Sequence, residues 1–476
     1  MLKIRAWDCP AIMRTVAEKE RRIANGGLNE RLYIVNNEKM KKTKPAAGSE
    51  ASSCPYFKKC GGCDYIGIPY EEQLKKKQDY VRRCLGEPAK TWKCTIEPII
   101  GAEQPLYYRN KVHSVFDRDA KGKIIRGLYT EGTHKVINVS GCRLEDRTAD
   151  AIIEEIKSLL PSFKLKVYDE DTGYGWLRHV LVRVGQRLLS ADIGCMSNQD
   201  NLNATGPEYM VVLVTSEVPF PGKNNFIKAL RTKFPEISTI VQNINNKRTS
   251  MVLGDRNIVL YGKGYIVDES LGLKFRISPS SFFQINPKQT LKLYSLALEM
   301  AGLTGSERVL DAYCGTGTIG MFMSRQAREV VGVELNPDAV RDAASNAKAN
   351  GITNISFVNA DATRYMQQFA GELQAQGRLS AQQSEGWQPA LQAQKTQLGF
   401  DCLCMDPPRS GSTPEFIAAV ASLAIPRIVY VSCCVETLAR DLKEFTKKGY
   451  KVRRIAPVDM FPQTGHVETV ALLSKT

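Results

Sequence analysis

Two adjacent cysteines near the C-terminus could carry covalent chemistry. They lie in the stretch YVSCCVETL, residues 430–438, where a short apolar run gives way to a helical pattern. A free cysteine is most often a small buried side chain, but a thiolate near a helix N-terminus is stabilised and can act as a nucleophile. Cys433 ends the predicted strand and precedes the predicted helix. We therefore take Cys433 as the candidate nucleophile and expect Cys434 to pack or to tune the site weakly.

A carboxylate further along the chain could work with this thiol. One reaction that needs both a thiol and a carboxylate is substitution at carbon 5 of a pyrimidine. This carbon is a poor nucleophile, but addition of a thiolate to carbon 6 makes the ring enolate-like and lets carbon 5 attack an electrophile. A base must then remove the carbon-5 proton so that elimination regenerates the thiol. In DMFPQTGHVETVALL, Glu468 opens the last predicted strand and is the candidate base. His466 is predicted to be a hydrogen-bonding residue of the preceding loop.

The elements that must position these groups form a repeating pattern from residue 271 onwards. Short apolar runs, separated by turns and helical segments, are typical of strands buried on both faces of a parallel sheet. The runs are RVLDA, EVVGVEL, ISFVNAD, DCLCMD and RIVYVSC. A helix is predicted between Pro337 and Gly351, because proline favours the first helical turn and glycine ends a helix. Residues 271–476 are therefore predicted to form a doubly wound α/β domain.

Polar residues follow each of these strands, where an open α/β sheet binds its ligands. They are Asp311, Tyr313 and Gly315, then Glu334, Asp361, Asp406 and finally Cys433. The turn Gly315-Thr316-Gly317 lets the backbone approach a ligand closely, and Glu334 suits hydrogen bonds to a ribose diol. The turn is neither a P-loop nor a full G-x-G-x-x-G, which disfavours ATP and NAD. The ordered set indicates an S-adenosylmethionine-dependent methyltransferase, and Arg409 in DPPR disfavours the branch that methylates amino groups.

Composition limits the class of protein and its partners. The chain has 476 residues, enough for two or three domains, and its 65 Lys and Arg exceed its 50 Asp and Glu, giving a net charge of +15. This excess of positive charge favours a polyanionic partner, RNA or DNA. The N-terminus lacks an apolar core for a signal peptide or membrane span, so we expect a cytoplasmic protein. Thirteen cysteines, an odd number, argue against a disulfide framework.

The region before residue 271 has a different organisation. Residues 1–50 are charged and weakly patterned, and they end in a Lys, Pro and Ser-rich linker. Alternating runs such as RHVLVRVG, LLSADIGC and YMVVLVTSE predict strands, with a helix in KNNFIKALRTKF. Residues 51–270 are thus predicted to be an α+β domain. Within the C-terminal domain, the Gln-rich stretch 367–397 is predicted to be a surface insertion.

A second group of cysteines has the spacing of metal ligands. Cys54, Cys60 and Cys63 are spaced C-x5-C-x2-C, and Cys142 is a possible fourth ligand. Four thiolates suit either zinc or an iron–sulfur cluster, and spacing alone does not choose between them. The other cysteines are predicted to be inert core or loop residues: Cys9, Cys84, Cys94, Cys195, Cys314, Cys402 and Cys404.

Several motifs together resemble a known enzyme family. FFQINPKQT, LDAYCGTGTIG, DPPRSG, YVSC, TLARDL and DMFPQTGHVET, in this order, resemble the RNA (uracil-5-)-methyltransferase family, which modifies 23S rRNA and tRNA. The resemblance covers roughly residues 51–476, except the Gln-rich insertion. It implies that Gln284, Tyr313, Glu334 and Asp406 bind S-adenosylmethionine, that Cys433 is the nucleophile and that Glu468 accepts the proton. The family usually has Ser-Cys-Asn-Pro where this chain has Ser-Cys-Cys-Val, and a basic residue where Ser410 stands.

The cluster-bearing branch of that family places a [4Fe-4S] centre on the same cysteine pattern. The resemblance thus implies that Cys54, Cys60, Cys63 and Cys142 bind such a cluster in an RNA-binding domain, with a structural role. Many members carry an OB-like module before the cluster, and residues 1–50 lack its strand pattern. The branch is associated with ribosomal RNA, which makes 23S rRNA the preferred substrate and tRNA the second.

Other interpretations stay open. The chain could be a cluster-bearing RNA-binding protein without catalysis, or a methyltransferase acting on amino groups. RNA contacts are predicted at three basic stretches: Lys75–Lys77, Arg82-Arg83 and Tyr107–His113. We expect a monomer with no membrane contact.

Overall fold

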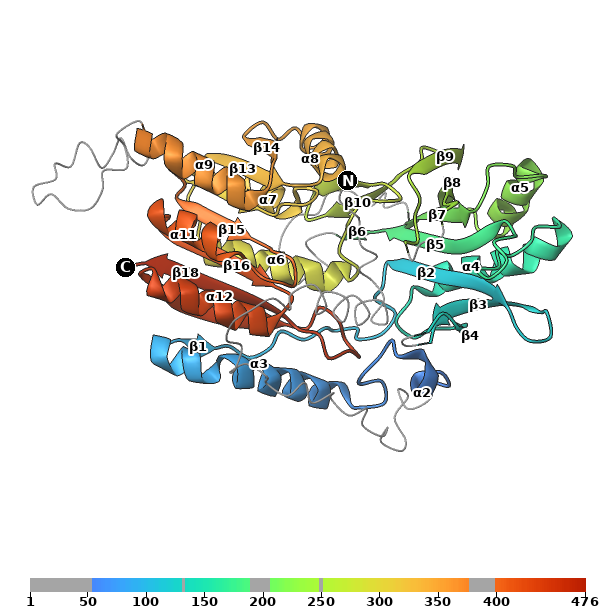
Figure 1. The fold of residues 1–476 in the computed structure, drawn as a ribbon, viewed down its shortest axis with the longest axis horizontal. Coiled ribbons are helices and arrows are strands. Elements are labelled where there is room, and N and C mark those ends of the chain that lie inside the picture. Colours follow the sequence, from blue (N-terminus) through green and yellow to red (C-terminus); the bar gives the residue numbers. More distant parts are fainter. Residues whose placement is uncertain (1–53, 131–132, 189–205, 248–250, 376–398) are drawn as a thin grey trace, which may run out of the picture.

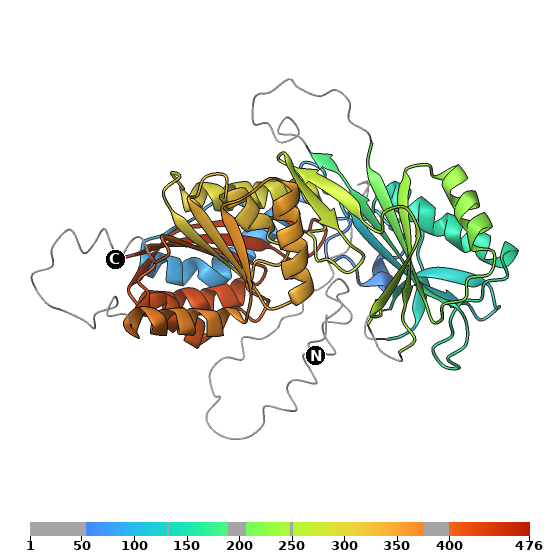
Figure 2. The ribbon, with the colours of Figure 1, turned by 90° about the horizontal axis from the view of Figure 1, so that it is seen from above.

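The computed structural model describes residues 54–130, 133–188, 206–247, 251–375 and 399–476, which form two lobes (Figure 1). The view from above in Figure 2 shows a separate sheet in each lobe. The N-terminal segment 1–50, Cys9, Cys195, and most of the run LLSADIGC and of the Gln-rich stretch lie outside the described residues. Residues 367–375, at the start of that stretch, belong to the helix α9 (Ala362–Ala375).

The C-terminal lobe contains an eight-stranded sheet with the order β1-β17-β18-β16-β15-β12-β13-β14. Its strands are β1 (Thr95–Ile96), β12 (Arg308–Ala312), β13 (Glu329–Glu334), β14 (Ile355–Asn359), β15 (Cys402–Met405), β16 (Arg427–Ser432), β17 (Tyr450–Val458) and β18 (Glu468–Lys475). All the predicted strands of this region are present, and those from β12 to β16 are parallel. β18 runs antiparallel to both of its neighbours. The predicted doubly wound α/β fold is therefore confirmed, with one reversed strand that the sequence pattern did not indicate.

Helices cover both faces of this sheet. One face packs against α6 (Pro287–Ala301), α7 (Thr318–Met323) and α8 (Pro337–Ala349), through side chains such as Leu291 and Ile319. The other face packs against α9, α11 (Pro414–Ser422) and α12 (Val435–Lys447). The central strands β12, β13, β15 and β16 are buried on both faces, which explains why they are continuous apolar runs in the sequence, whereas the edge strand β14 is only half-buried.

The helix α3 (Tyr70–Trp92) joins the second of these faces, although it lies far from the sheet in sequence. Its buried residues Val81, Leu85 and Ala89 belong to the same apolar core as α12. Strand β1, just after it, pairs with β17 at the edge of the sheet. The division of the chain at residues 50 and 270 stays a prediction, but the stretch from α3 to β1 packs with the C-terminal lobe (Figure 1).

The second lobe is built on a seven-stranded sheet with the order β4-β3-β2-β5-β7-β8-β9. These strands are β2 (Lys111–Arg118), β3 (Ile124–Tyr129), β4 (Val136–Asn138), β5 (Leu177–Gly185), β7 (Glu208–Thr215), β8 (Ile237–Ile244) and β9 (Arg256–Tyr261). Helices α4 (Arg147–Ser162) and α5 (Lys223–Lys233) pack on one face of it. The predicted α+β character of this region, including the helix in KNNFIKALRTKF, is confirmed.

A small sheet and a short helix complete the described fold. The sheet has the order β11-β10-β6, with β6 (Arg187–Leu188), β10 (Ile266–Ser270) and β11 (Leu273–Ile277). The helix α2 (Phe57–Cys60) carries one of the cysteines of the N-terminal motif. Among the described residues, no helix combines the length and the apolar composition that a membrane span requires.

Candidate active site

The loop after β12 forms one wall of a hollow at the carboxyl ends of the strands. Tyr313 and Gly315 both have positive φ, 63° and 56°, so the chain makes a tight left-handed turn there. Asp311, at the end of β12, accepts a hydrogen bond from the Gly320 backbone N–H at 2.8 Å. A Cβ on Gly320 would lie 2.7 Å from that carboxylate oxygen, which explains why a glycine stands there.

The hollow contains four of the six residues predicted to bind the cofactor, namely Gln284, Tyr313, Gly315 and Asp406. Glu334, a fifth, lies beside it and accepts hydrogen bonds from the backbone N–H of Gly315 at 3.1 Å and of Asn336 at 2.7 Å. Asp361, the sixth, lies close enough to Tyr313 for its charge to raise the pKa of the phenol, after the larger effect of burial. The structure thus brings the predicted set to one end of the sheet.

The hollow concentrates negative charge. Burial raises the pKa of Asp406 to about 7. Burial, with the nearby charges of Asp406 and Glu334, also raises the pKa of Asp311 to about 7, against the Gly320 hydrogen bond. Such a site is more stable when it holds a cationic ligand. The donor set and its charge therefore fit the sulfonium and amino groups of S-adenosylmethionine.

The candidate nucleophile and base lie on neighbouring strands. β16 and β18 pair antiparallel with Ser432 opposite Thr469, so Cys433 at the end of β16 lies next to Glu468 at the start of β18. β15 lies on the other side of β16, and Asp406 follows it. Cys433 interacts electrostatically with Glu468, Asp406 and Arg409. Three adjacent strand ends thus bring the thiol and both carboxylates together.

The helix N-terminus after Cys433 does not outweigh the groups that oppose ionisation of its thiol in the chain by itself. Burial first, and then the charges of Glu468 and Asp406, raise the pKa of this thiol, and the nearby Arg409 only partly opposes them. A thiol among carboxylates stays protonated because a second negative charge there is costly. The sequence showed the helix but not the carboxylates that β15 and β18 bring beside it.

Glu468 has the environment of a general base with a raised pKa. Its side chain is 6% exposed. Burial and then the charge of Asp406 raise its pKa to about 8, while Arg409 acts in the opposite direction. A carboxyl group whose pKa lies near the working pH can both take up and release a proton, as base catalysis requires.

The second cysteine of the pair has different surroundings. The thiol of Cys434 donates to Glu436 Oε2 at 3.4 Å, on the first turn of α12. On the side that faces α3, the charge of Cys434 contributes to raising the pKa of the Tyr80 phenol and of the Cys84 thiol, after the larger effect of burial. Cys434 is thus half-buried against the α3–α12 contact.

His466 is confirmed as a hydrogen-bonding residue of the loop before β18. Its Nδ1 lies 3.2 Å from Nη2 of Arg409, so it accepts a hydrogen bond when the ring is neutral. Burial, followed by the positive charges of Arg409, Lys77 and Arg109, lowers its pKa to about 4. The ring is therefore neutral at physiological pH and helps to hold Arg409 near the thiol.

The four cysteines of the N-terminal motif lie near enough to one another, around the helix α2, for their charges to interact. Burial raises the pKa of the Cys63 thiol, and the charges of Cys142, Cys60 and Cys54 raise it further. Burial also raises the pKa of Cys142 to about 12. The positive charge of Arg109 lowers the pKa of Cys60, Cys63 and Cys142 and so opposes the effect of burial. Yet no group of three or more His, Cys, Asp or Glu side chains in the described ranges is arranged to hold a metal ion. The thiols are gathered, but their arrangement is not that of a ready metal site.

Sequence reasoning missed two residues of the site. Arg409 interacts with Cys433, Glu468 and His466, although the DPPR motif served only to exclude one branch of methyltransferases. Tyr294 is 5% exposed and shares a side-chain hydrogen bond with Gln284. Its position in the middle of the amphipathic helix α6 gives no signal of a site residue.

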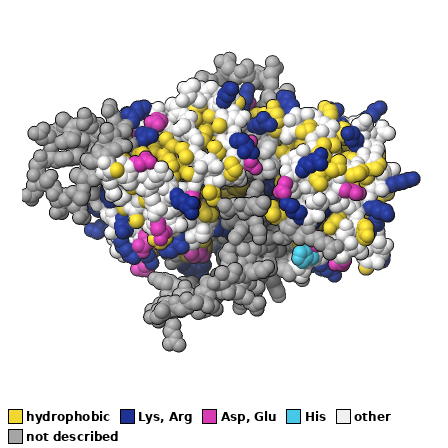
Figure 3. Space-filling model, turned by 45° about the horizontal axis from the view of Figure 1, so that its top comes forward, with side chains coloured by type: hydrophobic (Ala, Val, Ile, Leu, Met, Phe, Trp, Pro, Cys, Tyr) yellow, Lys and Arg dark blue, Asp and Glu magenta, His cyan; other side chains and the backbone are white. Residues whose placement is uncertain are grey.

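The predicted RNA contacts have mixed outcomes. Arg82 and Arg83 are exposed, but the prediction for Lys77 is wrong, since its side chain is 0% exposed and pairs with Asp459. Within Tyr107–His113, Tyr108 and Asn110 are buried. On the face shown in Figure 3, Lys and Arg side chains are spread over both lobes without forming one continuous strip.

The fold and the crevice define the class as an S-adenosylmethionine-dependent methyltransferase. A family model described as tRNA (Uracil-5-)-methyltransferase matches residues 229–476. An uncharacterized RNA methyltransferase of Halalkalibacterium halodurans is 38% identical over 420 residues, covering 88% of this chain and 82% of that protein. One from Clostridium acetobutylicum is 39% identical over 424 residues, covering 89% of this chain and 83% of that protein.

A solved structure agrees with these relatives. The Pyrococcus abyssi tRNA (uracil-54, C5)-methyltransferase, in complex with S-adenosyl-L-homocysteine, is 25% identical, with a TM-score of 0.64 over 87% of this chain and 86% of that one. The chain belongs to the RNA (uracil-5-)-methyltransferase family.

Proposed function

We propose that the chain methylates carbon 5 of a uridine in 23S rRNA through a covalent bond between Cys433 and carbon 6 of the base. The observation that carries this proposal is the meeting of Cys433, Glu468 and Asp406 at three adjacent strand ends. A methyltransferase acting on nitrogen needs neither a thiol nor a base at this place.

The roles follow from the chemistry of each group. The thiol of Cys433 first releases its proton to water. The resulting thiolate adds to carbon 6 of the uracil, and the ring electrons move to carbon 5, which becomes the nucleophile. Gln284, Tyr313, Gly315, Glu334, Asp361 and Asp406 would hold S-adenosylmethionine, whose sulfonium would give its methyl group to carbon 5 and leave as the thioether S-adenosyl-L-homocysteine. Glu468 then takes the carbon-5 proton, carbon 5 and carbon 6 regain their double bond, and the thiolate leaves.

The uracil can reach Cys433 only if its nucleotide leaves the stack of neighbouring bases in the RNA. Flipping costs a few kcal/mol unless the RNA already exposes the nucleotide. Phe282 lines the hollow and is 62% exposed, so its ring can stack on a base outside a helix. The net charge of +15 supports contacts with the phosphate backbone.

The identity of the RNA is tested by comparing two substrates. We expect the purified protein, with S-adenosylmethionine, to form 5-methyluridine in a 23S rRNA transcript and to leave tRNA transcripts unmodified. Mass spectrometry of nucleosides from both RNAs measures the product, and the same analysis of RNA from cells with and without the gene locates the site. Product only in tRNA would replace the proposed substrate by tRNA. Product in neither RNA would contradict the proposed activity and favour a non-catalytic RNA-binding protein.

We further propose that Cys54, Cys60, Cys63 and Cys142 bind a structural [4Fe-4S] cluster. Support comes from the mutual coupling of these thiols and from the cysteine pattern, while their present arrangement requires adjustment on binding. The positive charge of Arg109 beside them would offset part of the negative charge of a thiolate-bound cluster.

Anaerobic purification tests this cluster. We expect about four iron and about four sulfide per chain, with a broad visible absorption, both lost in Cys63→Ser. Cys94→Ser, which changes a half-buried cysteine outside the group, serves as the control and should keep both. Stoichiometric zinc in place of iron would contradict the proposal.

A further inference from the structure

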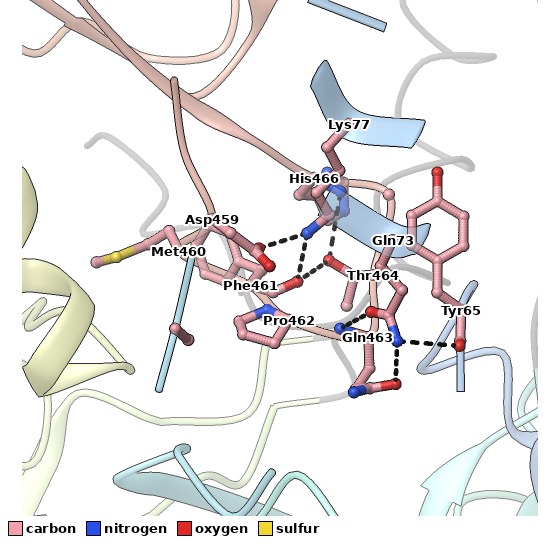
Figure 4. Close-up of polar contacts among 12 residues, drawn as sticks. Tyr65, Gln73, Lys77, Asp459, Met460, Phe461, Pro462, Gln463, Thr464 and His466 are labelled. Atoms are coloured by element: carbon pink, nitrogen blue, oxygen red, sulfur yellow. Dashed lines mark hydrogen bonds and ion pairs between the residues drawn. The ribbon is translucent and has the colours of Figure 1, made fainter. Parts of the chain in front are cut away.

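The segment 459–467, between β17 and β18, leads directly into Glu468 and is held by side chains from distant parts of the chain (Figure 4). The ammonium of Lys77, on α3, donates to Asp459 Oδ1 at 2.5 Å and to the Phe461 carbonyl at 3.0 Å. The hydroxyl of Tyr70, on the same helix, donates to Asp459 Oδ2 at 2.8 Å. One carboxylate thus joins two residues of α3 to the start of this segment.

Two more side chains fix the second half of the segment. Gln73 Nε2 donates to Gln463 Oε1 at 3.0 Å, and the Gln463 backbone N–H donates back to Gln73 Oε1 at 3.0 Å. The backbone of Gln463 has a φ of 69°, a conformation that a non-glycine residue keeps only when its surroundings fix it. Asp64 Oδ2 accepts a hydrogen bond from the Gly465 N–H at 2.8 Å.

The ion pair within this network is fully buried. The side chains of Lys77 and Asp459 are both 0% exposed. A buried ion pair gains little over a well-packed apolar pair, because removing both charges from water is costly. What such a pair does provide is a defined geometry. Here the pair fixes the start of the segment whose end carries His466 and leads into Glu468.

We propose that Lys77, acting through Asp459, is a positioning residue for the base Glu468. The inference rests on the proposed function, in which Glu468 removes the carbon-5 proton after the thiol has added to the ring. Addition requires Cys433, which follows β16 and takes part in none of the hydrogen bonds described above, whereas elimination requires Glu468, which directly follows the segment. Loss of the ion pair should therefore slow elimination much more than addition.

The variant Lys77→Met tests this, because it removes the ammonium and keeps most of the length. We expect turnover on RNA to fall about 10- to 100-fold, as small displacements of a catalytic group do. S-adenosyl-L-homocysteine should bind as to the unchanged protein. A protein–RNA adduct that survives denaturing electrophoresis should accumulate. Lys76→Met is the matched control, since Lys76 is partly exposed on the same helix and pairs with the exposed Glu72, and it should show normal turnover and no adduct.

A gentler variant guards against misfolding. Tyr70→Phe deletes only the hydroxyl, which donates to Asp459 and also accepts a hydrogen bond from the Ala102 N–H at 2.7 Å, and it should lower turnover several-fold with a smaller amount of adduct. Circular dichroism measures the fraction of folded protein in each variant. The positioning role would be overturned if turnover fell only in proportion to that fraction and neither variant formed an adduct. Adduct in Glu468→Gln but not in Lys77→Met would remove the role of Lys77 alone. No adduct in Glu468→Gln would count against the proposed base itself.

Discussion

Cys433→Ala is expected to abolish methyl transfer to RNA, at least about 10⁴-fold, while S-adenosylmethionine still binds. Without the thiol, carbon 5 of the uracil keeps its low nucleophilicity, because the neighbouring thiol of Cys434 is directed to Glu436 instead. The residues proposed to hold the cofactor lie on other loops, so its binding should not change. Transfer of a radiolabelled methyl group to RNA and calorimetric titration with the cofactor measure the two effects.

Cys434→Ala is the control for this experiment. Its thiol contacts Glu436 on α12, and its surroundings are those of the α3–α12 contact. Activity should stay within about threefold of the unchanged protein, as is usual for a substitution that removes one weak contact. Full activity of Cys433→Ala together with loss in Cys434→Ala would reverse the assignment of the nucleophile. Full activity of both variants would contradict the covalent mechanism.

The alternation of apolar runs and helices predicted the doubly wound sheet because its central strands are buried on both faces, and each such strand is visible as a short local run in the sequence. The residues after each strand followed from the same reasoning, since parallel strands end at one edge. The reversal of β18 could not be predicted in this way. Its residues form an apolar run like the others, and its direction is set by pairing between β16 and β17.

The position of α3 depends on contacts that no local pattern contains. Lys77 and Asp459 are 382 residues apart, and their pairing follows from packing of the whole lobe. One local signal did exist. Lys77 falls on the buried stripe of the helix with Gln73, Val81 and Leu85, and a lysine on an apolar stripe indicates a buried partner. Interpreting it as part of a basic surface run overlooked this periodicity.

The electrostatics of the thiol were the least predictable part of the site. The helix N-terminus after Cys433 was visible in the sequence, and by itself it favours the thiolate. The opposing carboxylates, Asp406 and Glu468, come from two other strands, and burial adds to their effect. Whether a thiol is ionised is thus decided by the sum of neighbours in space.

Glu468→Gln is expected to trap the reaction after addition of the thiol. The amide cannot take the carbon-5 proton, so elimination should fall by about 10²- to 10⁴-fold, the usual contribution of a general base. Cys433 remains able to add to carbon 6, and the adduct should accumulate as a slowly migrating protein–RNA species on denaturing gels. The control is Glu436→Gln, which changes an acid on α12 outside the three strand ends and should form product without adduct. Free methylated RNA produced by Glu468→Gln at the normal rate would contradict the assignment.

The dependence on pH provides an independent check on the same residue. Because burial and Asp406 raise the pKa of Glu468 to about 8, the carboxyl group is mostly protonated at pH 6 and becomes a base only as the pH rises. Product formation should therefore increase with pH between about 6 and 8, by up to tenfold per unit for a single ionisation. The raised pKa of Cys433 acts in the same direction on the addition step.

Comparing adduct formation by Glu468→Gln with turnover of the unchanged protein isolates the contribution of Glu468, because the variant lacks that ionisation and keeps those of the thiol, Asp406 and Asp311. Turnover that does not change with pH over this range would exclude a buried carboxyl group as the base.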